Sequence, residues 1–172
     1  MGFHQGLRFQ QLPRLAAGHG RNANKLASKC GRIVLVDINE SNIQFCRRRF
    51  GNDPRFTYLR NNGYDLSGVS DNSVTLLFCY DAMVHFDSDV VRAYLNETRR
   101  VLVSGGQAFF HYSNYQDNPE GDVHDNPGWR NFMSIPLFKH YAHKEGLEVL
   151  TTRAVRPCDG GYRDAVSLLR KP

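Results

Sequence analysis

The sequence lacks the features of a membrane protein, of a disulfide scaffold and of a metal-binding domain. Its 172 residues contain no apolar run long enough to cross a bilayer, and residues 1–11 lack the apolar core of a signal peptide. The four cysteines are far apart and form no CxxC pair, which argues against a zinc site and a disulfide framework. Three of them lie in apolar patterns, where a reduced cysteine is a small hydrophobe, so we expect a cytoplasmic protein without a metal.

The sequence also lacks a basic stretch interleaved with aromatic residues, although its net charge is +5. The densest basic cluster, residues 47–49, falls on one predicted helix, where a solvated face explains it better than a nucleic-acid contact. The charge therefore decides little, and without an aromatic stacking motif we expect no nucleic-acid partner. With 41% hydrophobic and 23% charged residues, the composition is typical of a single globular domain, here residues 1–172.

Short apolar runs alternate with amphipathic segments along the whole chain. The run at 32–37 predicts a buried strand, because continuous β-branched residues are typical of a sheet covered on both faces. Ser41 and Gln44 have the spacing of a capping box at the start of the next helix. Further strands are expected at 56–59, 74–80, 107–112, 147–155 and 165–169, and further helices at 22–30, from 87 or 88, and at 136–145. The alternation predicts an α/β fold with a doubly wound, mostly parallel sheet, and the closing strand-turn-strand around Asp159-Gly160-Gly161 predicts an antiparallel last strand.

A glycine turn, Gly18-His19-Gly20, lies between a would-be first strand and a helix. In open parallel sheets, ligands bind beyond the carboxyl ends of the strands, where the strand order reverses. Glycine lets the backbone approach a ligand there, and the free amides at the helix start attract an anion. Asp37 ends the next strand, 19 residues after Gly18, and is placed to accept hydrogen bonds from the ribose of a nucleoside cofactor.

The same two features leave other interpretations open. Residues 18–23 also fit the G-x-G-x-x-A pattern of a dinucleotide site, which would indicate an NAD-dependent oxidoreductase. A tight glycine turn followed by a surface aspartate would be structural only.

Four segments spread along the chain occur in an order typical of one enzyme family. They are Ala17-Gly18-His19-Gly20-Arg21-Asn22, Val34-Leu35-Val36-Asp37, Asp71-Asn72-Ser73-Val74 and Val101-Leu102-Val103-Ser104-Gly105-Gly106. The ordered set resembles the class I S-adenosylmethionine-dependent methyltransferases, although Ser104 replaces the proline of the family's L-x-P-G-G crossover. The resemblance covers roughly residues 15 to 170 and implies a Rossmann-like, mostly parallel seven-stranded sheet with an antiparallel last strand.

The resemblance also implies that S-adenosylmethionine is the cofactor. Gly18 and Gly20 would pack against its methionine part and Asp37 would hold its ribose. Asn61 or Asn62 would reach the adenine, where the family often has aspartate, but the composition at 61–63 suits a plain turn equally. The implied cofactor-binding residues are Ala17, Gly18, Gly20, Asp37, Ile38, Asn61 and Asn62.

Two histidines are the candidate catalytic residues. The sulfonium methyl is already activated, so a methyltransferase mainly aligns the acceptor, and a general base is needed only if the acceptor arrives protonated. His85 follows the fourth strand, where many relatives carry a histidine, and His111 ends the fifth beside Tyr112. Either ring could instead be held by a local backbone carbonyl. The long polar segment 113–130 is expected to be a functional loop.

The first strand departs from the family pattern. Arg14 occupies the position where the family has an acidic residue, and Pro13 lacks the amide that a central strand needs. The sequence therefore predicts a degraded first strand and an atypical or poorly ordered stretch over 1–14. Cofactor binding is then either weakened or lost, leaving a catalytically inert methyltransferase-fold binding domain, or it is completed by a partner subunit or by the loop 113–130.

The methyl acceptor is not encoded in these motifs, because fold does not fix substrate. Without a nucleic-acid signature, we expect a small molecule or a saccharide. The sequence does not fix an oligomeric state.

Overall fold

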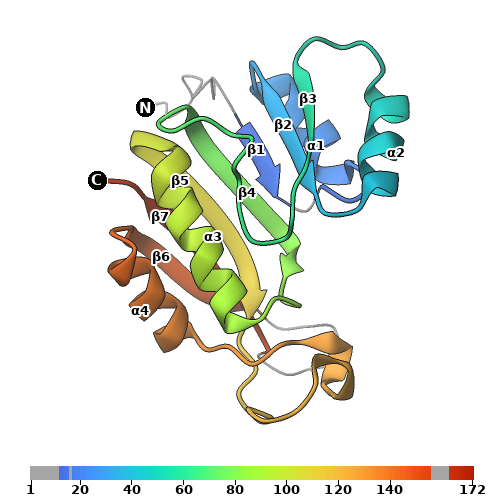
Figure 1. Ribbon diagram of the computed structural model, residues 1–172. Coiled ribbons are helices and arrows are strands. Elements are labelled where there is room, and N and C mark those ends of the chain that lie inside the picture. Colours follow the sequence, from blue (N-terminus) through green and yellow to red (C-terminus); the bar gives the residue numbers. More distant parts are fainter. Residues whose placement is uncertain (1–11, 16, 156–162) are drawn as a thin grey trace, which may run out of the picture.

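The computed structural model describes residues 12–15, 17–155 and 163–172, and within these ranges seven strands form one mixed sheet in the order β3-β2-β1-β4-β5-β7-β6 (Figure 1). The strands are β1 (Leu12–Leu15), β2 (Ile33–Asp37), β3 (Phe56–Arg60), β4 (Val74–Met83), β5 (Leu102–Ser113), β6 (Glu148–Val155) and β7 (Asp164–Arg170). The helices are α1 (Arg21–Leu26), α2 (Glu40–Phe50), α3 (Ser88–Val101) and α4 (Ile135–Lys144), with short 3-10 turns η1 (Ala27–Lys29), η2 (Val123–Asp125) and η3 (Pro127–Trp129). β7 runs antiparallel to both of its neighbours, while β1 to β5 pair in parallel.

The expected α/β fold is therefore confirmed. The order of the strands reverses between β1 and β4, and the carboxyl ends of both strands lie at the edge where a ligand site was expected. The predicted turn at 159–161, Cys158 and residues 1–11 of the atypical N-terminal stretch lie outside the described residues.

β1 forms in spite of its proline, but it is short. Its four residues pair with β2, whereas only Arg14 pairs with β4, opposite Phe78. Pro13 offers no N–H to a neighbouring strand, and this agrees with the narrow pairing of β1 with β4. The first strand is thus central in the sheet and reduced in length.

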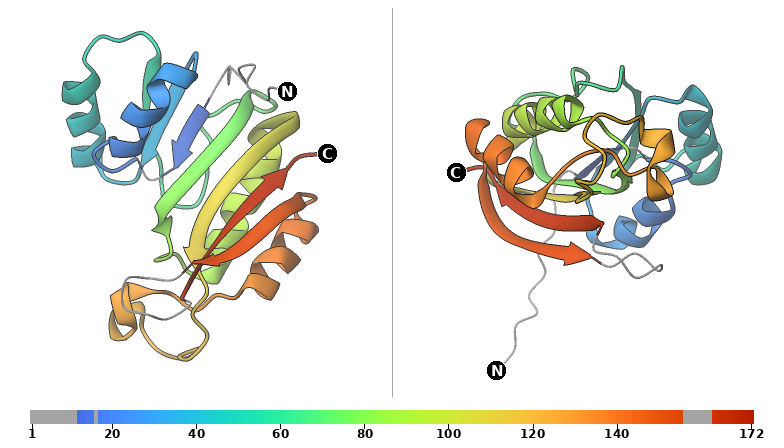
Figure 2. Two further views of the ribbon diagram at one scale, coloured as in Figure 1. Left: turned by 180° about the vertical axis from the view of Figure 1, so that it is seen from behind. Right: turned by 90° about the horizontal axis from the view of Figure 1, so that it is seen from below.

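The burial of β2 shows which helices cover which face. Ile33 and Leu35 pack in a cluster with residues of α1 and α2, while Val34 and Val36 belong to the larger cluster with α3 and α4. All five residues of β2 are buried, as expected for a strand covered on both faces. The helices lie on opposite sides of the sheet, with α3 and α4 together on one of them (Figure 2).

The predicted capping box is wrong. α2 begins at Glu40, directly after Asn39, so Ser41 lies inside the helix, and the side chain of Gln44 donates to Glu40. The reason is the side chain of Asp37, which accepts the Asn39 amide, so that the helix starts two residues closer to the N-terminus than predicted.

The strand expected at 107–112 starts earlier than predicted, because α3 ends at Val101 and β5 begins at Leu102 and runs through Ser104-Gly105-Gly106. No helix among the described residues is long and apolar enough to cross a membrane.

Candidate functional site

The end of β2 and the glycine turn are joined through the carboxylate of Asp37. Its Oδ2 accepts the Gly18 amide at 2.8 Å, and its Oδ1 accepts the Asn39 amide at 2.9 Å and the Asn42 side-chain amide at 3.2 Å. Asp37 is only 5% exposed. These contacts fix the direction of the carboxylate, which faces the turn as the sequence predicts.

The two glycines of the turn serve different purposes. Both are left-handed, with φ of 49° at Gly18 and 72° at Gly20. A Cβ on Gly20 would lie 2.6 Å from the ring of Phe50, so Gly20 is required for the packing of α2. A Cβ on Gly18 would meet no atom within 4 Å, so the Gly18 backbone borders open space. Ala17, just before the turn, is buried.

One cavity, of about 500 Å³, opens between the end of β2 and α3; we call it the Asp37 cavity. It is polar at Asp37 and Asn61, whereas Ile38, Phe86 and Tyr94 contribute apolar surface. Ile38 is 52% exposed and offers apolar surface to a ligand in this cavity. All of the predicted cofactor residues except Ala17 and Gly20 line this cavity.

The two asparagines after β3 differ in their contacts. Asn61 donates from Nδ2 to the Tyr94 hydroxyl and to the Asp65 carbonyl, both at 2.8 Å, and so holds its amide at the cavity wall. Asn62 closes its own turn, because its Oδ1 accepts the amides of Tyr64 and Asp65. Asn62 therefore stabilises a turn, as its composition suggested. Asn61 is the better placed of the two to contact a ligand.

Tyr94 completes the wall beside Asn61. Burial raises the pKa of its hydroxyl to about 12, and the hydrogen bond from Asn61 lowers it only in part. The hydroxyl therefore keeps its proton at neutral pH. Since it accepts from Asn61, its proton is free to be donated to a second group.

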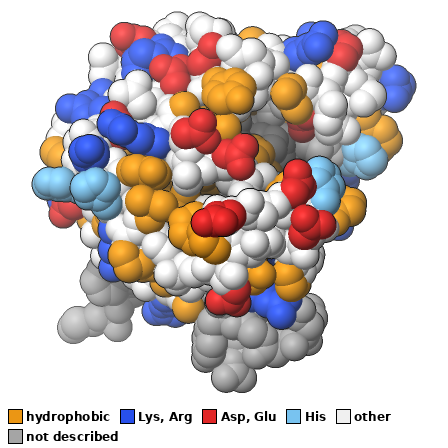
Figure 3. Space-filling view, turned by 60° about the horizontal axis from the view of Figure 1, so that its bottom comes forward, with side chains coloured by type: hydrophobic (Ala, Val, Ile, Leu, Met, Phe, Trp, Pro, Cys, Tyr) orange, Lys and Arg blue, Asp and Glu red, His pale blue; other side chains and the backbone are white. Residues whose placement is uncertain are grey.

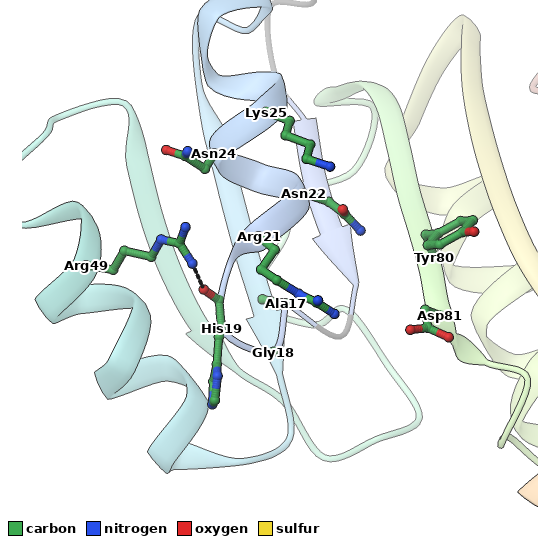
Figure 4. A pocket seen from close by; sticks show the side chains of 10 residues that line it. All are labelled: Ala17, Gly18, His19, Arg21, Asn22, Asn24, Lys25, Arg49, Tyr80 and Asp81. Atoms are coloured by element: carbon green, nitrogen blue, oxygen red, sulfur yellow. Dashed lines mark hydrogen bonds between the residues drawn. The ribbon is translucent and has the colours of Figure 1, made fainter. Parts of the chain in front are cut away.

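A second cavity, also of about 500 Å³, lies between α1 and β4; we call it the Arg21 cavity. Arg21, Asn22 and Lys25 extend from α1 toward Tyr80 and Asp81 on β4 (Figure 4). Gly18 and Asp81 line both cavities, so the two meet at these residues. Together they form a long site, polar and cationic at one end and partly apolar at the other.

The space-filling view shows this end of the molecule hollowed, with acidic and histidine side chains on the rim (Figure 3). Within 12–15, 17–155 and 163–172, no group of three or more His, Cys, Asp or Glu side chains is placed to hold a metal ion.

Asp81 is the residue at the junction that sequence reasoning missed. It is a non-glycine residue with φ of 61°, a conformation that costs roughly 1–2 kcal/mol and tends to occur at functional sites. Its side chain is exposed, and its amide donates to His111 Nδ1 at 3.1 Å. Its only sequence signal was its position just after the predicted fourth strand, which in the structure runs on to Met83.

His85 lines the Asp37 cavity with an exposed side chain. Its Nδ1 lies 2.7 Å from the carbonyl oxygen of Trp129, 44 residues further on. A carbonyl only accepts, so Nδ1 carries the proton and Nε2 keeps its lone pair. The ring is held by a backbone carbonyl, although by one that is distant in the sequence. The bond uses only Nδ1 and leaves Nε2 able to take a proton.

His111 is placed differently from His85. It is 4% exposed, and since Nδ1 accepts the Asp81 amide, Nε2 carries the proton. Nε2 lies 3.2 Å from Asp164 Oδ2, without the alignment of a good hydrogen bond. The ring stacks on Tyr80 with centroids 4.6 Å apart. His111 lines neither the Asp37 cavity nor the Arg21 cavity, so the expected contact of His111 with the acceptor has no support in its geometry.

The segment between β5 and α4 crosses the carboxyl ends of the strands (Figure 1). Arg130 makes two hydrogen bonds to Asp164 on β7, at 2.9 and 2.7 Å, and the Asn131 amide donates to the Val84 carbonyl. Burial opposes ionisation of Asp164, but the hydrogen bonds from Arg130 and the nearby ring of His111 lower its pKa to about 2. The predicted functional loop is thus anchored at two points, at Asp164 on β7 and at Val84 after β4.

Residues 14–106, more than half of the chain, match the model of the methyltransferase domain family. The chain belongs to this family. The predicted kinship with the S-adenosylmethionine-dependent methyltransferases is therefore confirmed. S-adenosylmethionine is the cofactor typical of this family.

Solved methyltransferase structures share the fold of this methyltransferase-domain protein. Geranyl diphosphate C-methyltransferase from Streptomyces coelicolor, solved with S-adenosyl-L-homocysteine, matches with a TM-score of 0.78 at 14% identity over 95% of this chain and 73% of that one. A TehB-like S-adenosylmethionine-dependent methyltransferase from Corynebacterium glutamicum matches with a TM-score of 0.71 at 17% identity, covering 96% and 82% of the two chains.

The [4+2]-cyclase SpnF matches with a TM-score of 0.74 at 15% identity, covering 95% and 74% of the two chains. Identities this low show a common fold and nothing finer. No curated protein matches the sequence.

Proposed function

We propose that this methyltransferase-domain protein binds S-adenosylmethionine across the Asp37 and Arg21 cavities and transfers its methyl group to a small-molecule acceptor. The hydrogen bond between the Asp37 carboxylate and the Gly18 amide carries the proposal, because it sets an anionic acceptor beside an open glycine backbone. Two parts of a nucleoside ligand, the ribose and the chain attached to it, can then be held at one point.

The Asp37 cavity fits the adenosine half of the ligand. A carboxylate has about four lone-pair sites, and three of those on Asp37 are taken by N–H donors. A ribose hydroxyl can use the fourth, and the long Asn42 contact is the one that a second hydroxyl could displace. The exposed face of Ile38 and the ring of Tyr94 suit a flat base, with the Tyr94 hydroxyl proton available to it.

The Arg21 cavity fits the methionine half. Arg21 and Lys25 bring positive charge toward a carboxylate, while Asp81 faces the junction with a negative one. This distribution matches a ligand that carries an anionic and a cationic group on one short chain. The short β1 and Pro13 leave the position of Gly18 intact, since the Ala17 amide still donates to the Val36 carbonyl at 2.9 Å.

When bound, S-adenosylmethionine supplies a methyl group already activated for transfer. The protein then has to orient the acceptor and, for a hydroxyl or ammonium acceptor, to take a proton. We assign the proton to His85 Nε2, because the Trp129 carbonyl fixes the ring with this nitrogen free at the Asp37 cavity. The loop that carries Trp129 reaches the site through this contact with His85.

A small-molecule acceptor is supported by the relative that acts on geranyl diphosphate. The two cavities, of about 500 Å³ each, together hold one nucleoside ligand and leave room for a compact acceptor. A saccharide unit is one such acceptor. A nucleic-acid acceptor has no support from the charge pattern.

The inert binding domain is the second candidate, and the shortened β1 favours it. The two candidates separate in a methyl-transfer assay with labelled S-adenosylmethionine over a panel of hydroxyl, amine and carboxylate compounds. Transfer to any of them excludes the inert domain.

Calorimetry with S-adenosylhomocysteine tests the binding site directly, with NAD as the competing ligand. We expect one molecule of S-adenosylhomocysteine bound per chain and no displacement by NAD. Binding of NAD alone would favour the oxidoreductase, and binding of neither would defeat the proposed function.

A further inference from the structure

Asp81 has a strained backbone at the point where the two cavities meet. A left-handed conformation in a non-glycine residue persists only when the surroundings fix it. Within the described residues, no group hydrogen-bonds to the Asp81 carboxylate, which is exposed at the junction. The strain therefore has to be held through the backbone.

The backbone is held by a side chain from the neighbouring strand. β4 and β5 lose their regular register between Cys79 and Met83, so the Asp81 amide is not paired with the backbone of β5. His111 on β5 accepts this amide at Nδ1, 3.1 Å away. One imidazole nitrogen thus substitutes for the missing rung of the ladder.

His111 is itself held by two neighbours. Tyr80 stacks on one face of the ring, and Asp164 faces Nε2 at 3.2 Å. Asp164 is 3% exposed and is clamped by two hydrogen bonds from Arg130. A buried carboxylate opposite Nε2 keeps the proton on that nitrogen and leaves Nδ1 as an acceptor.

We propose that His111 is a positioning residue, braced by Asp164 and Arg130, that holds the Asp81 carboxylate at the junction so that the site prefers a cationic ligand to a neutral one. The inference rests on the proposed function, because the ligand pair in question is cationic S-adenosylmethionine and its neutral product S-adenosylhomocysteine. A fixed negative charge at the junction favours the substrate over the product and so assists exchange of product for substrate.

The test is the ratio of two dissociation constants, for S-adenosylhomocysteine and for S-adenosylmethionine, measured by calorimetry. Asp81→Asn removes the charge and is expected to lower this ratio about tenfold, equivalent to about 1.4 kcal/mol. His111→Leu leaves the charge but removes the acceptor for the Asp81 amide, and we expect a similar fall. His111→Asn is the matched control, because its Oδ1 can occupy the place of Nδ1 and should keep the ratio close to that of the unmodified protein.

A role in folding alone predicts a different result, namely that His111→Leu weakens both ligands equally and leaves the ratio unchanged. That outcome, or an unchanged ratio in Asp81→Asn, overturns the inference while the proposed function stands. Failure of the unmodified protein to bind either ligand defeats the proposed function and this inference with it.

A second measurement needs neither ligand nor a variant. In ¹⁵N NMR spectra of the free protein, His111 should be the neutral tautomer with the proton on Nε2. A proton on Nδ1 would mean that His111 does not accept the Asp81 amide, and would also overturn the inference.

Discussion

Asp37 and Gly18 lie 19 residues apart in the sequence and are joined by a hydrogen bond of 2.8 Å from the Gly18 amide to the Asp37 carboxylate. The contact arises because β1 and β2 are adjacent parallel strands, whose carboxyl ends meet at one edge of the sheet. The Ala17 amide, which donates to the Val36 carbonyl, carries this pairing one residue past β1. The relationship therefore depends on β1 being in place, short as it is.

Replacing Asp37 by Ala should weaken the binding of S-adenosylhomocysteine by about tenfold to a hundredfold, since a hydrogen bond to a charged group contributes about 1.5–3 kcal/mol. Calorimetry measures the change. Asp53→Ala, which removes an exposed ion pair with Arg55 before β3, is the control and should bind normally. Equal affinities in both variants would show that Asp37 does not contact the ligand.

The glycine turn offers two variants, one that should mainly lower stability and one that should mainly lower affinity. Gly20→Ala places a Cβ 2.6 Å from Phe50 and should lower the free energy of unfolding by about 2 kcal/mol or more, from left-handed strain and overpacking. Gly18→Ala carries the strain without the clash, so its stability loss should be smaller. Its methyl group faces the site, however, and should reduce affinity for S-adenosylhomocysteine. Urea unfolding and calorimetry check the two effects, and the reverse ranking in stability would contradict the assignment.

His85→Gln should slow transfer to a hydroxyl or ammonium acceptor by about a hundredfold, the lower range for loss of a general base. Affinity for S-adenosylhomocysteine should change much less than the rate, because the proton transfer is assigned to His85 Nε2 whereas its ring only borders the Asp37 cavity. His140→Gln, an exposed histidine on α4, provides the control. Once an acceptor is found, initial rates and calorimetry on both variants decide the point, and a full rate in His85→Gln would remove His85 from the mechanism.

The parts of the site that the sequence predicts are those set by local chain geometry. The turn at Gly18 and the aspartate that ends β2 follow from a glycine motif and a buried strand, each visible within a few residues. The adenine-side choice between Asn61 and Asn62 could not be made from sequence, since it depends on the Tyr94 hydroxyl, which α3 brings in from 33 residues away.

The surroundings of His111 could not be predicted from the sequence for the same reason. Its position at the end of a strand was predicted, but its burial against Asp164 depends on the antiparallel pairing of β5 with β7. The conformation of Asp81 depends on a register shift between β4 and β5 that no residue type announces. Pro13 predicted a degraded first strand. β1 is indeed short, but it forms, because its narrow pairing with β4 accommodates a residue that central strands usually exclude.

The ion pair between Asp164 and Arg130 predicts how stability depends on pH. The pKa of Asp164 falls from an ordinary value of 3.8 to about 2, so its ionised form is favoured in the folded state. The stabilisation of about 2 kcal/mol is fully present well above pH 4 and is lost as the pH falls toward about 2. Asp164→Asn should therefore lower the free energy of unfolding at pH 7 by at least this amount, because Arg130 also loses its partner.

The difference between Asp164→Asn and the unmodified protein should shrink as the pH falls from 5 to about 3, because the Asp164 carboxyl of the unfolded state takes up a proton in this range while that of the folded state stays ionised. Urea unfolding across this range measures it. Asp117→Asn, with an exposed side chain on the same loop, should leave the curve unchanged. A difference that stays constant with pH would mean that Asp164 stabilises the loop by packing, and that its charge does not brace His111.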